Sequence, residues 1–232
     1  MIEPENIKVI AFDADDTLWD CQSYFEKVEN RLYDIIKPYC ENPAKELFNT
    51  ESANMEDLGY GSKAFTISII ETALRVGKGN ITHSQLTELL KSCKELLQIP
   101  ATPLPGVEFT LKALQDTDKK IVVFTKGELQ DQENKLKRSG LSQYFSYYEI
   151  TSNKSEKEYR MLCEHLSIAP KELLMVGNSM KSDIIPALSI GSSAVYIPFH
   201  VTWQLEKIEE VKEHDKMLKI KSMSDILPLF SI

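Results

Sequence analysis

The chain has 232 residues, of which 42% are hydrophobic, and its 35 acidic and 27 basic residues give a net charge of −8. This length and apolar content allow a full buried core, which excludes a disordered or fibrous protein. The acidic balance offers no basic surface for nucleic acid or an anionic membrane. We therefore expect a small-molecule substrate and neither a nucleic-acid nor a membrane partner.

Targeting and redox signals are weak. The first six residues contain two acids and no apolar run, and no stretch of about 18 apolar residues occurs in the chain. We expect neither a secretory signal nor a membrane span. The cysteines form no Cys-x-x-Cys pair, which argues against a zinc or redox site and favours reduced core thiols in a cytoplasmic protein. These cysteines are Cys21, Cys40, Cys93 and Cys163.

Short apolar runs predict the strands of a parallel sheet. The first, at 7–12, ends abruptly in acidic residues, which indicates that its carboxyl end opens into a polar site. Further strands are expected at 120–124, 173–177 and 194–198, with a weaker one at 147–150. Helices are expected between them at 107–114, 129–139, 159–166 and 184–190. This alternation predicts an α/β fold with a parallel sheet covered on both faces.

The region from about 20 to 100 interrupts this alternation with apolar residues at helical spacing. Helices are expected at about 24–39, 44–57, 63–77 and 83–97. A group of three prolines between 100 and 105 marks the return to the α/β pattern. We therefore expect an α/β core formed by residues 1–18 and 101–232, and an all-helical insertion formed by residues 19–100.

Two carboxylates follow the first strand. Asp13 and Asp15 occupy positions i and i+2, so both side chains could point into one site. In open parallel sheets, ligands bind outside the carboxyl ends of the strands, near the point where the strand order reverses. An isolated Asp-x-Asp pair also occurs in caps and turns, so its place at a strand end is what favours a functional site.

Four segments in chain order resemble the motifs of the haloacid dehalogenase superfamily. Residues 12–18 resemble its Asp-x-Asp-x-Thr motif, and residues 123–127 resemble the second motif, a strand that ends in Ser or Thr. Lys154 is similar to the lysine of the third motif. Residues 176–183 resemble the fourth, Gly-Asp-x-x-x-x-Asp, with Asn178 in place of the first acid. The resemblance implies a Rossmann-like, doubly wound core whose helical insertion is similar to a C1-type cap.

The resemblance also implies a magnesium-dependent phosphohydrolase. Asp13 would attack phosphorus and form an aspartyl-phosphate, which divides one difficult step into two. Asp15 would protonate the leaving oxygen and then activate water, a role for which its neighbours should tune the carboxyl towards neutrality. Because a phosphate ester is anionic, a metal ion and a lysine must offset its repulsion of the attacking carboxylate.

Two segments would supply charge and hydrogen bonds around the phosphate. Lys154 would neutralise charge beside Asp13. We prefer it to Lys157, because it lies closer to the end of a strand, whereas Lys157 falls inside the next expected helix. Thr125, with the adjoining Lys126 and Gly127, would bind the non-bridging phosphoryl oxygens.

The implied cofactor is Mg²⁺, which prefers oxygen ligands and keeps several waters. The family pattern assigns it to the Asp13 carboxylate, the backbone carbonyl of Asp15 and the Asp183 carboxylate. Asn178 either ligates the metal or orients a bound water, or it only braces the loop. Because an amide adds no negative charge, the metal would bind less tightly than with an acid at this position.

Some nearby residues stay unassigned. Trp19, Gln22 and Phe25 follow the first motif and either face the substrate or pack between cap and core. His200 follows the last expected strand and is either a surface residue or a neighbour of the site. The leaving group and the oligomeric state are unknown from the sequence.

Three other functions stay open beside hydrolysis of a small phosphorylated metabolite. Metal-free dehalogenases of the superfamily lack an acid at the position of Asp15, so its presence favours phosphoryl chemistry. A phosphomutase would pass the phosphoryl group to a sugar instead of water, and nothing in the motifs excludes it. A binding module without activity would explain Asn178, but the other motif residues are all present.

Overall fold

The computed structural model describes residues 2–208 and 214–232. The chain forms two compact units, one of Met1–Asp20 with Ala101–Ile232 and one of Cys21–Pro100. The chain first passes from one unit to the other after Asp20, two residues beyond the boundary expected from the sequence. The reason is that Leu18 and Trp19 are completely buried in the hydrophobic core of the first unit.

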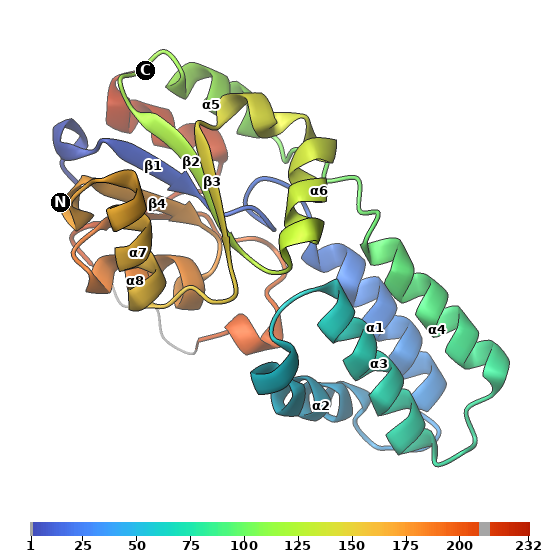
Figure 1. Ribbon diagram of the computed structural model, residues 1–232. Coiled ribbons are helices and arrows are strands. Elements are labelled where there is room, and N and C mark those ends of the chain that lie inside the picture. The colour runs from blue at the N-terminus through green and yellow to red at the C-terminus, as the bar shows by residue number, and fades with distance from the viewer. Residues whose placement is uncertain (1, 209–213) are drawn as a thin grey trace. The chain divides into compact units, whose positions relative to one another are not determined.

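A parallel sheet forms the centre of this core unit (Figure 1). Its six strands in the described part are β1 (Val9–Phe12), β2 (Lys120–Lys126), β3 (Tyr147–Thr151), β4 (Leu173–Gly177), β5 (Ser193–Tyr196) and β6 (Met217–Lys219). All neighbouring strands are parallel, in the order β3-β2-β1-β4-β5-β6. The order reverses between β1 and β4, which confirms the predicted doubly wound α/β fold. Folds of this kind bind ligands at the carboxyl ends of the strands, next to such a reversal.

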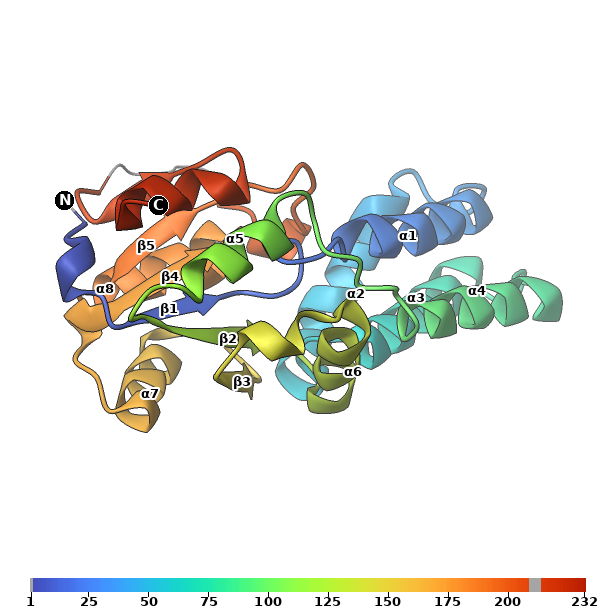
Figure 2. The ribbon, with the colours of Figure 1, turned by 90° about the horizontal axis from the view of Figure 1, so that it is seen from above.

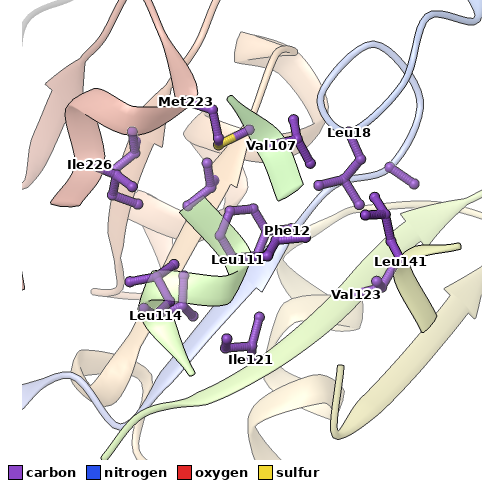
Figure 3. Packing of buried hydrophobic residues seen from close by; sticks show 14 of the residues in the cluster. Phe12, Leu18, Val107, Leu111, Leu114, Ile121, Val123, Leu141, Met223 and Ile226 are labelled. Atoms are coloured by element: carbon purple, nitrogen blue, oxygen red, sulfur yellow. The ribbon is translucent and has the colours of Figure 1, made fainter. Parts of the chain in front are cut away.

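Helices cover both faces of the sheet, as Figure 2 shows for α5 and α7. The helices of this unit are α5 (Val107–Leu114), α6 (Leu129–Ser139), α7 (Glu156–Leu166) and α8 (Ile185–Ser189). On one face, Phe12 of β1 packs in a cluster with Leu111 of α5 and Met223 near the C-terminus (Figure 3). On the other, Phe124 of β2 packs edge-on against Tyr159 of α7. Because both faces are covered there, every residue of the central strands β1 and β4 is buried, and both strands are apolar.

Local signals in the sequence fix several helix ends. At the start of α7, Ser155 Oγ accepts a hydrogen bond from the backbone of Lys157, and Glu158 Oε2 accepts one from the backbone of Ser155. Gly140 ends α6 with a φ of 72°, a left-handed conformation that favours glycine.

Two parts of the core unit were not predicted. The segment after β4 begins with a π-helical turn at Met180–Ile184 before α8, so the chain coils there earlier than expected. The short strand β6 and the 3₁₀ helix Met223–Phe230 lie beyond the last expected strand. A strand of three residues is too short to show a periodic pattern in the sequence.

The second unit consists of helices, as expected. They are α1 (Gln22–Ile36), α2 (Pro43–Leu58), α3 (Ser62–Gly77) and α4 (His83–Leu96). The Phe25 ring packs against the Phe65 ring of the same unit, with the two ring centroids 4.9 Å apart. A capping box of Thr82 and Gln85 opens α4. No helix in the described residues is long and apolar enough to cross a bilayer.

Candidate active site

The parallel sheet brings the four sequence motifs to one edge. Asp13 follows β1, and its backbone N–H donates to the Val176 carbonyl of β4 at 2.9 Å, which extends the pairing of the two central strands. Thr125 lies near the carboxyl end of β2, and Lys154 lies in the connection between β3 and α7. Asn178 follows β4 directly. The topology therefore places all four motifs where a doubly wound sheet binds its ligands.

A buried ammonium group links two carboxylates. Lys154 Nζ donates to Asp13 Oδ1 at 2.5 Å and to Asp183 Oδ1 at 2.8 Å, and the lysine and Asp183 side chains are each only 1% exposed. Lys157 is exposed on α7. The structure thus brings Lys154, the lysine preferred from the sequence, against the expected nucleophile.

Burial and charge shift the ionisation of this cluster. Burial, together with the negative charge of Asp183, raises the pKa of Asp13 to about 7, although Lys154 acts in the opposite direction. Burial disfavours the Lys154 ammonium, but the Asp13 and Asp183 carboxylates outweigh this effect and raise its pKa. Lys154 therefore stays charged and supplies positive charge at the carboxylate expected to attack phosphorus.

Asp183 is held by its own loop. Its Oδ2 accepts a hydrogen bond from the Ser179 backbone at 2.8 Å, while Oδ1 is bound to Lys154. The carboxylate lies over Gly177, where an added Cβ would stand 2.3 Å from Asp183 Oδ2. Glycine at this position therefore makes room for the carboxylate, which uses both oxygens in contacts within the protein.

A second group of oxygens converges beside Asp13. The side-chain amide of Asn178 has one terminal atom 3.2 Å from the Asp15 carbonyl oxygen and 3.3 Å from Asp13 Oδ2. With nitrogen at that position, the amide donates hydrogen bonds to both. With oxygen there, the amide oxygen faces the other two oxygens at a spacing of about 3 Å, which adjacent ligands have around Mg²⁺. In that orientation the donor set fits a small hard cation.

Acidic side chains alone do not form such a site. Among the described residues, no three His, Cys, Asp or Glu side chains come together to hold a metal ion.

The Asp15 side chain has surroundings that differ from the sequence expectation. Its carboxylate accepts hydrogen bonds from Trp19 Nε1, Gln132 Nε2 and Lys135 Nζ, with distances of 2.8–2.9 Å. Burial opposes ionisation, but Lys135 and these hydrogen bonds hold the pKa of Asp15 below its ordinary value. The expectation that its neighbours tune Asp15 towards neutrality is therefore wrong for this arrangement. The indole of Trp19 is buried in the core unit and bound to Asp15.

The sequence pattern of the haloacid dehalogenase-like hydrolases matches residues 7–191. The chain belongs to this family. The resemblance inferred from the four motifs is thereby confirmed, and the protein is an enzyme of the hydrolase class.

Characterised relatives and a solved structure share most of the length of this hydrolase. A glyceraldehyde 3-phosphate phosphatase of Methanothermobacter thermautotrophicus is 25% identical over 84% of the chain and 88% of the relative. A phosphoglycolate phosphatase of Neisseria gonorrhoeae is 26% identical over 84% of the chain and 81% of the relative. The crystal structure of a haloacid dehalogenase-like hydrolase from Xanthomonas campestris is 28% identical, with a TM-score of 0.86 and coverage of 97% of this chain and 93% of that chain.

The residues that follow Thr125 in this hydrolase make contacts within the protein. Lys126 Nζ donates to Ser182 Oγ at 2.7 Å and pairs with Glu206 at 2.5 Å. The Gly127 backbone N–H donates to the Thr151 carbonyl at 3.0 Å. The Lys126 ammonium and the Gly127 amide are therefore already engaged, and of the three expected phosphate-binding residues the buried Thr125 fits that role best.

Glu206 was not singled out from the sequence. Its Oε2 accepts hydrogen bonds from Ser179 Oγ and Ser182 Oγ, each at 2.6 Å. Burial opposes its ionisation, but Lys126 and the two serines hold its pKa below the ordinary value. Glu206 thus ties the loop after β4 to the end of β2. Glu206 lies in a 3₁₀ helix of three residues, Gln204–Glu206, and nothing in the sequence of so short an element indicates its partner.

Proposed function

We propose that this hydrolase is a magnesium-dependent phosphatase that cleaves a small phosphate monoester through an aspartyl-phosphate on Asp13. The contacts of Asp13 carry the proposal. Its Oδ1 receives a hydrogen bond from the buried Lys154 ammonium, and its Oδ2 faces the oxygens of the candidate cation site. Positive charge on both sides of a carboxylate is what attack on an anionic ester requires.

Asp13 Oδ2, the Asp15 carbonyl oxygen and the amide oxygen of Asn178 would hold the Mg²⁺. When bound, the ion offsets the negative charge of the phosphoryl oxygens. Asp183 was expected to be a ligand from the family resemblance. Each of its oxygens accepts one hydrogen bond within the protein, and we propose that Asp183 also holds Lys154 against Asp13.

The chain's own residues account for the two half-reactions. An oxygen of Asp13 forms a bond to phosphorus while the bond to the leaving oxygen breaks. The protonated form of Asp15, which its hydrogen-bond donors disfavour, gives that oxygen a proton. Water then attacks phosphorus, its proton passes to Asp15, and the bond between phosphorus and Asp13 breaks. Thr125 binds a phosphoryl oxygen during both steps, and Lys154 neutralises charge beside the reacting carboxylate.

Two phosphatase relatives support a small phosphorylated metabolite as the substrate class. Their names specify glyceraldehyde 3-phosphate and phosphoglycolate, which are both small phosphate monoesters. We propose that the helical unit acts as a cap that shields the reacting groups from water and selects among such substrates.

The test compares the wild type with Asp13→Asn and with the control Asp116→Asn, whose side chain is exposed at the end of α5. A panel of small phosphate monoesters is assayed for phosphate release with Mg²⁺ and with excess chelator. We expect release that needs Mg²⁺, is lost in Asp13→Asn and persists in the control. Metal-independent halide release from a 2-haloacid, without phosphate release, would show a dehalogenase instead. Phosphoryl transfer to a sugar at the expense of phosphate release would show a phosphomutase.

A further inference from the structure

The Asp15 carboxylate accepts hydrogen bonds from three side chains. Trp19 Nε1 donates to Oδ1 at 2.8 Å, and Gln132 Nε2 donates to Oδ2 at 2.8 Å. Lys135 Nζ donates to both oxygens, at 2.9 and 2.8 Å. These hydrogen bonds reach both carboxylate oxygens from three side chains. They therefore hold the carboxylate in one orientation.

Gln132 and Lys135 reach Asp15 from one face of α6. They are three residues apart, a spacing that places two side chains side by side on a helix. Gln132 Nε2 also donates to the Lys126 carbonyl at 3.0 Å, which ties α6 to the end of β2. Gly127 has a φ of 139°, and a Cβ there would lie 3.0 Å from Gln132 Nε2. Because Gly127 has no Cβ, the Gln132 side chain has room to pass it and reach the Lys126 carbonyl and Asp15.

These two residues are costly to bury. Gln132 and Lys135 are 4% and 3% exposed, and the buried Gln132 Oε1 accepts no hydrogen bond among the described residues. A buried polar atom without a hydrogen-bond partner destabilises the folded state. A buried ion pair often contributes no more to stability than apolar side chains of the same volume would. Stability alone therefore gives a poor reason for this arrangement around Asp15.

We propose that Lys135 and Gln132 are positioning residues that hold the ionised Asp15 carboxylate in place for hydrolysis of the aspartyl-phosphate. The inference rests on the proposed phosphatase function and deepens it. In this step the water oxygen bonds to phosphorus, the bond to Asp13 breaks, and the water proton passes to Asp15. Because Lys135 donates to both oxygens of Asp15, one oxygen can take the proton while Lys135 stays bound to the other.

Dinitrophenyl phosphate separates this step from the first one, since its leaving group departs without a proton. We compare Lys135→Met with the wild type, with Lys135→Arg and with Lys137→Met, an exposed lysine on the same helix. In Lys135→Met we expect a burst of dinitrophenolate stoichiometric with enzyme, followed by turnover about 100-fold slower than wild type, with KM little changed. Lys135→Arg should recover much of the rate, and Lys137→Met should match the wild type.

Acid quenching during turnover completes the experiment. The slowed variant should accumulate enzyme phosphorylated on Asp13, as should Asp15→Asn. Equal loss of the burst and of the later turnover would overturn the proposal, because a purely structural defect slows both steps. Unchanged turnover would overturn it as well. Failure of the wild type to form any phosphoenzyme would instead refute the proposed function itself.

Gln132→Leu provides the test if Lys135→Met does not fold. It removes one donor to Asp15 without changing the charge of the protein. A burst followed by turnover about tenfold slower would support the positioning role. Turnover equal to the wild type, in a protein that folds normally by circular dichroism, would show that the glutamine does not position Asp15 and would overturn the proposal.

Discussion

Replacing Lys154 by methionine should destabilise the core unit strongly. The ammonium lies 2.5 Å from Asp13 Oδ1 and 2.8 Å from Asp183 Oδ1, in a site almost closed to water. Removing one partner of a buried ion pair costs about 3–5 kcal/mol, because the remaining charge is left buried without compensation. Since one ammonium serves two carboxylates here, we expect the free energy of unfolding at about pH 8 to fall by about 5 kcal/mol.

The loss should be smaller in acid. Burial and Asp183 raise the pKa of Asp13 from 3.8 to about 7. A carboxyl group with a raised pKa in the folded state contributes stability that is complete below its ordinary pKa and is lost as the pH rises through the raised one. At about pH 5.5, Asp13 is therefore mostly protonated, and Lys154→Met leaves one carboxylate unpaired instead of two. We expect a loss of about 3 kcal/mol there.

Urea unfolding followed by circular dichroism at the two pH values measures both losses. Lys157→Met is the matched control, because this lysine is exposed on α7 three residues away. The control should stay within about 0.5 kcal/mol of the wild type. The reasoning is refuted if Lys154→Met is as stable as the wild type at about pH 8, or if its loss increases in acid.

Three further substitutions test other parts of the site. Gly177→Ala should cost about 1–3 kcal/mol in urea unfolding and lower kcat, because the new methyl group displaces the Asp183 carboxylate; unchanged stability would contradict the close approach. Asn178→Asp adds negative charge to the candidate cation site and should lower the Mg²⁺ concentration for half-maximal activity by about tenfold, whereas an unchanged metal titration would place the residue outside the metal shell. Asp15→Asn should slow hydrolysis of an alkyl phosphate by about 10²–10⁴-fold, and equal rates would exclude Asp15 as the acid.

The sequence predicts the site well where the chemistry lies at the ends of strands. The apolar strand before Asp13 and the similar run before Asn178 become adjacent strands, so their polar ends must meet. The preference for Lys154 over Lys157 used the same reasoning. Proximity to a strand end distinguishes the two lysines, and in the structure Lys154 alone of this pair contacts Asp13.

The contacts of Asp15 could not be predicted in this way. Gln132 and Lys135 lie 117 and 120 residues away in the chain, in the middle of a helix. A buried lysine on an amphipathic helix gives the same sequence pattern as an exposed one at the edge of its polar face. The positive charge near Asp15 comes from Lys135, which belongs to none of the four motifs. This charge lowers the pKa of Asp15 instead of raising it.

Lys126 shows a second limit of sequence reasoning. Its place after Thr125 favours a role at the phosphate, because a cation near a strand end suits an anionic ligand. The structure directs its ammonium to Glu206 and Ser182 instead. Glu206 lies in a short 3₁₀ helix 80 residues later, and neither periodicity nor spacing in the sequence relates the two side chains.

The central claim is that Asp13 carries the phosphoryl group during turnover. Rapid acid quenching with a hydrolysed phosphate ester and Mg²⁺, followed by peptide mass analysis, measures this directly. The account predicts phosphate on the peptide that contains Asp13, and none on that peptide in Asp13→Asn. Turnover with phosphate on a different residue, or undiminished turnover by the Asp13→Asn variant, would contradict it.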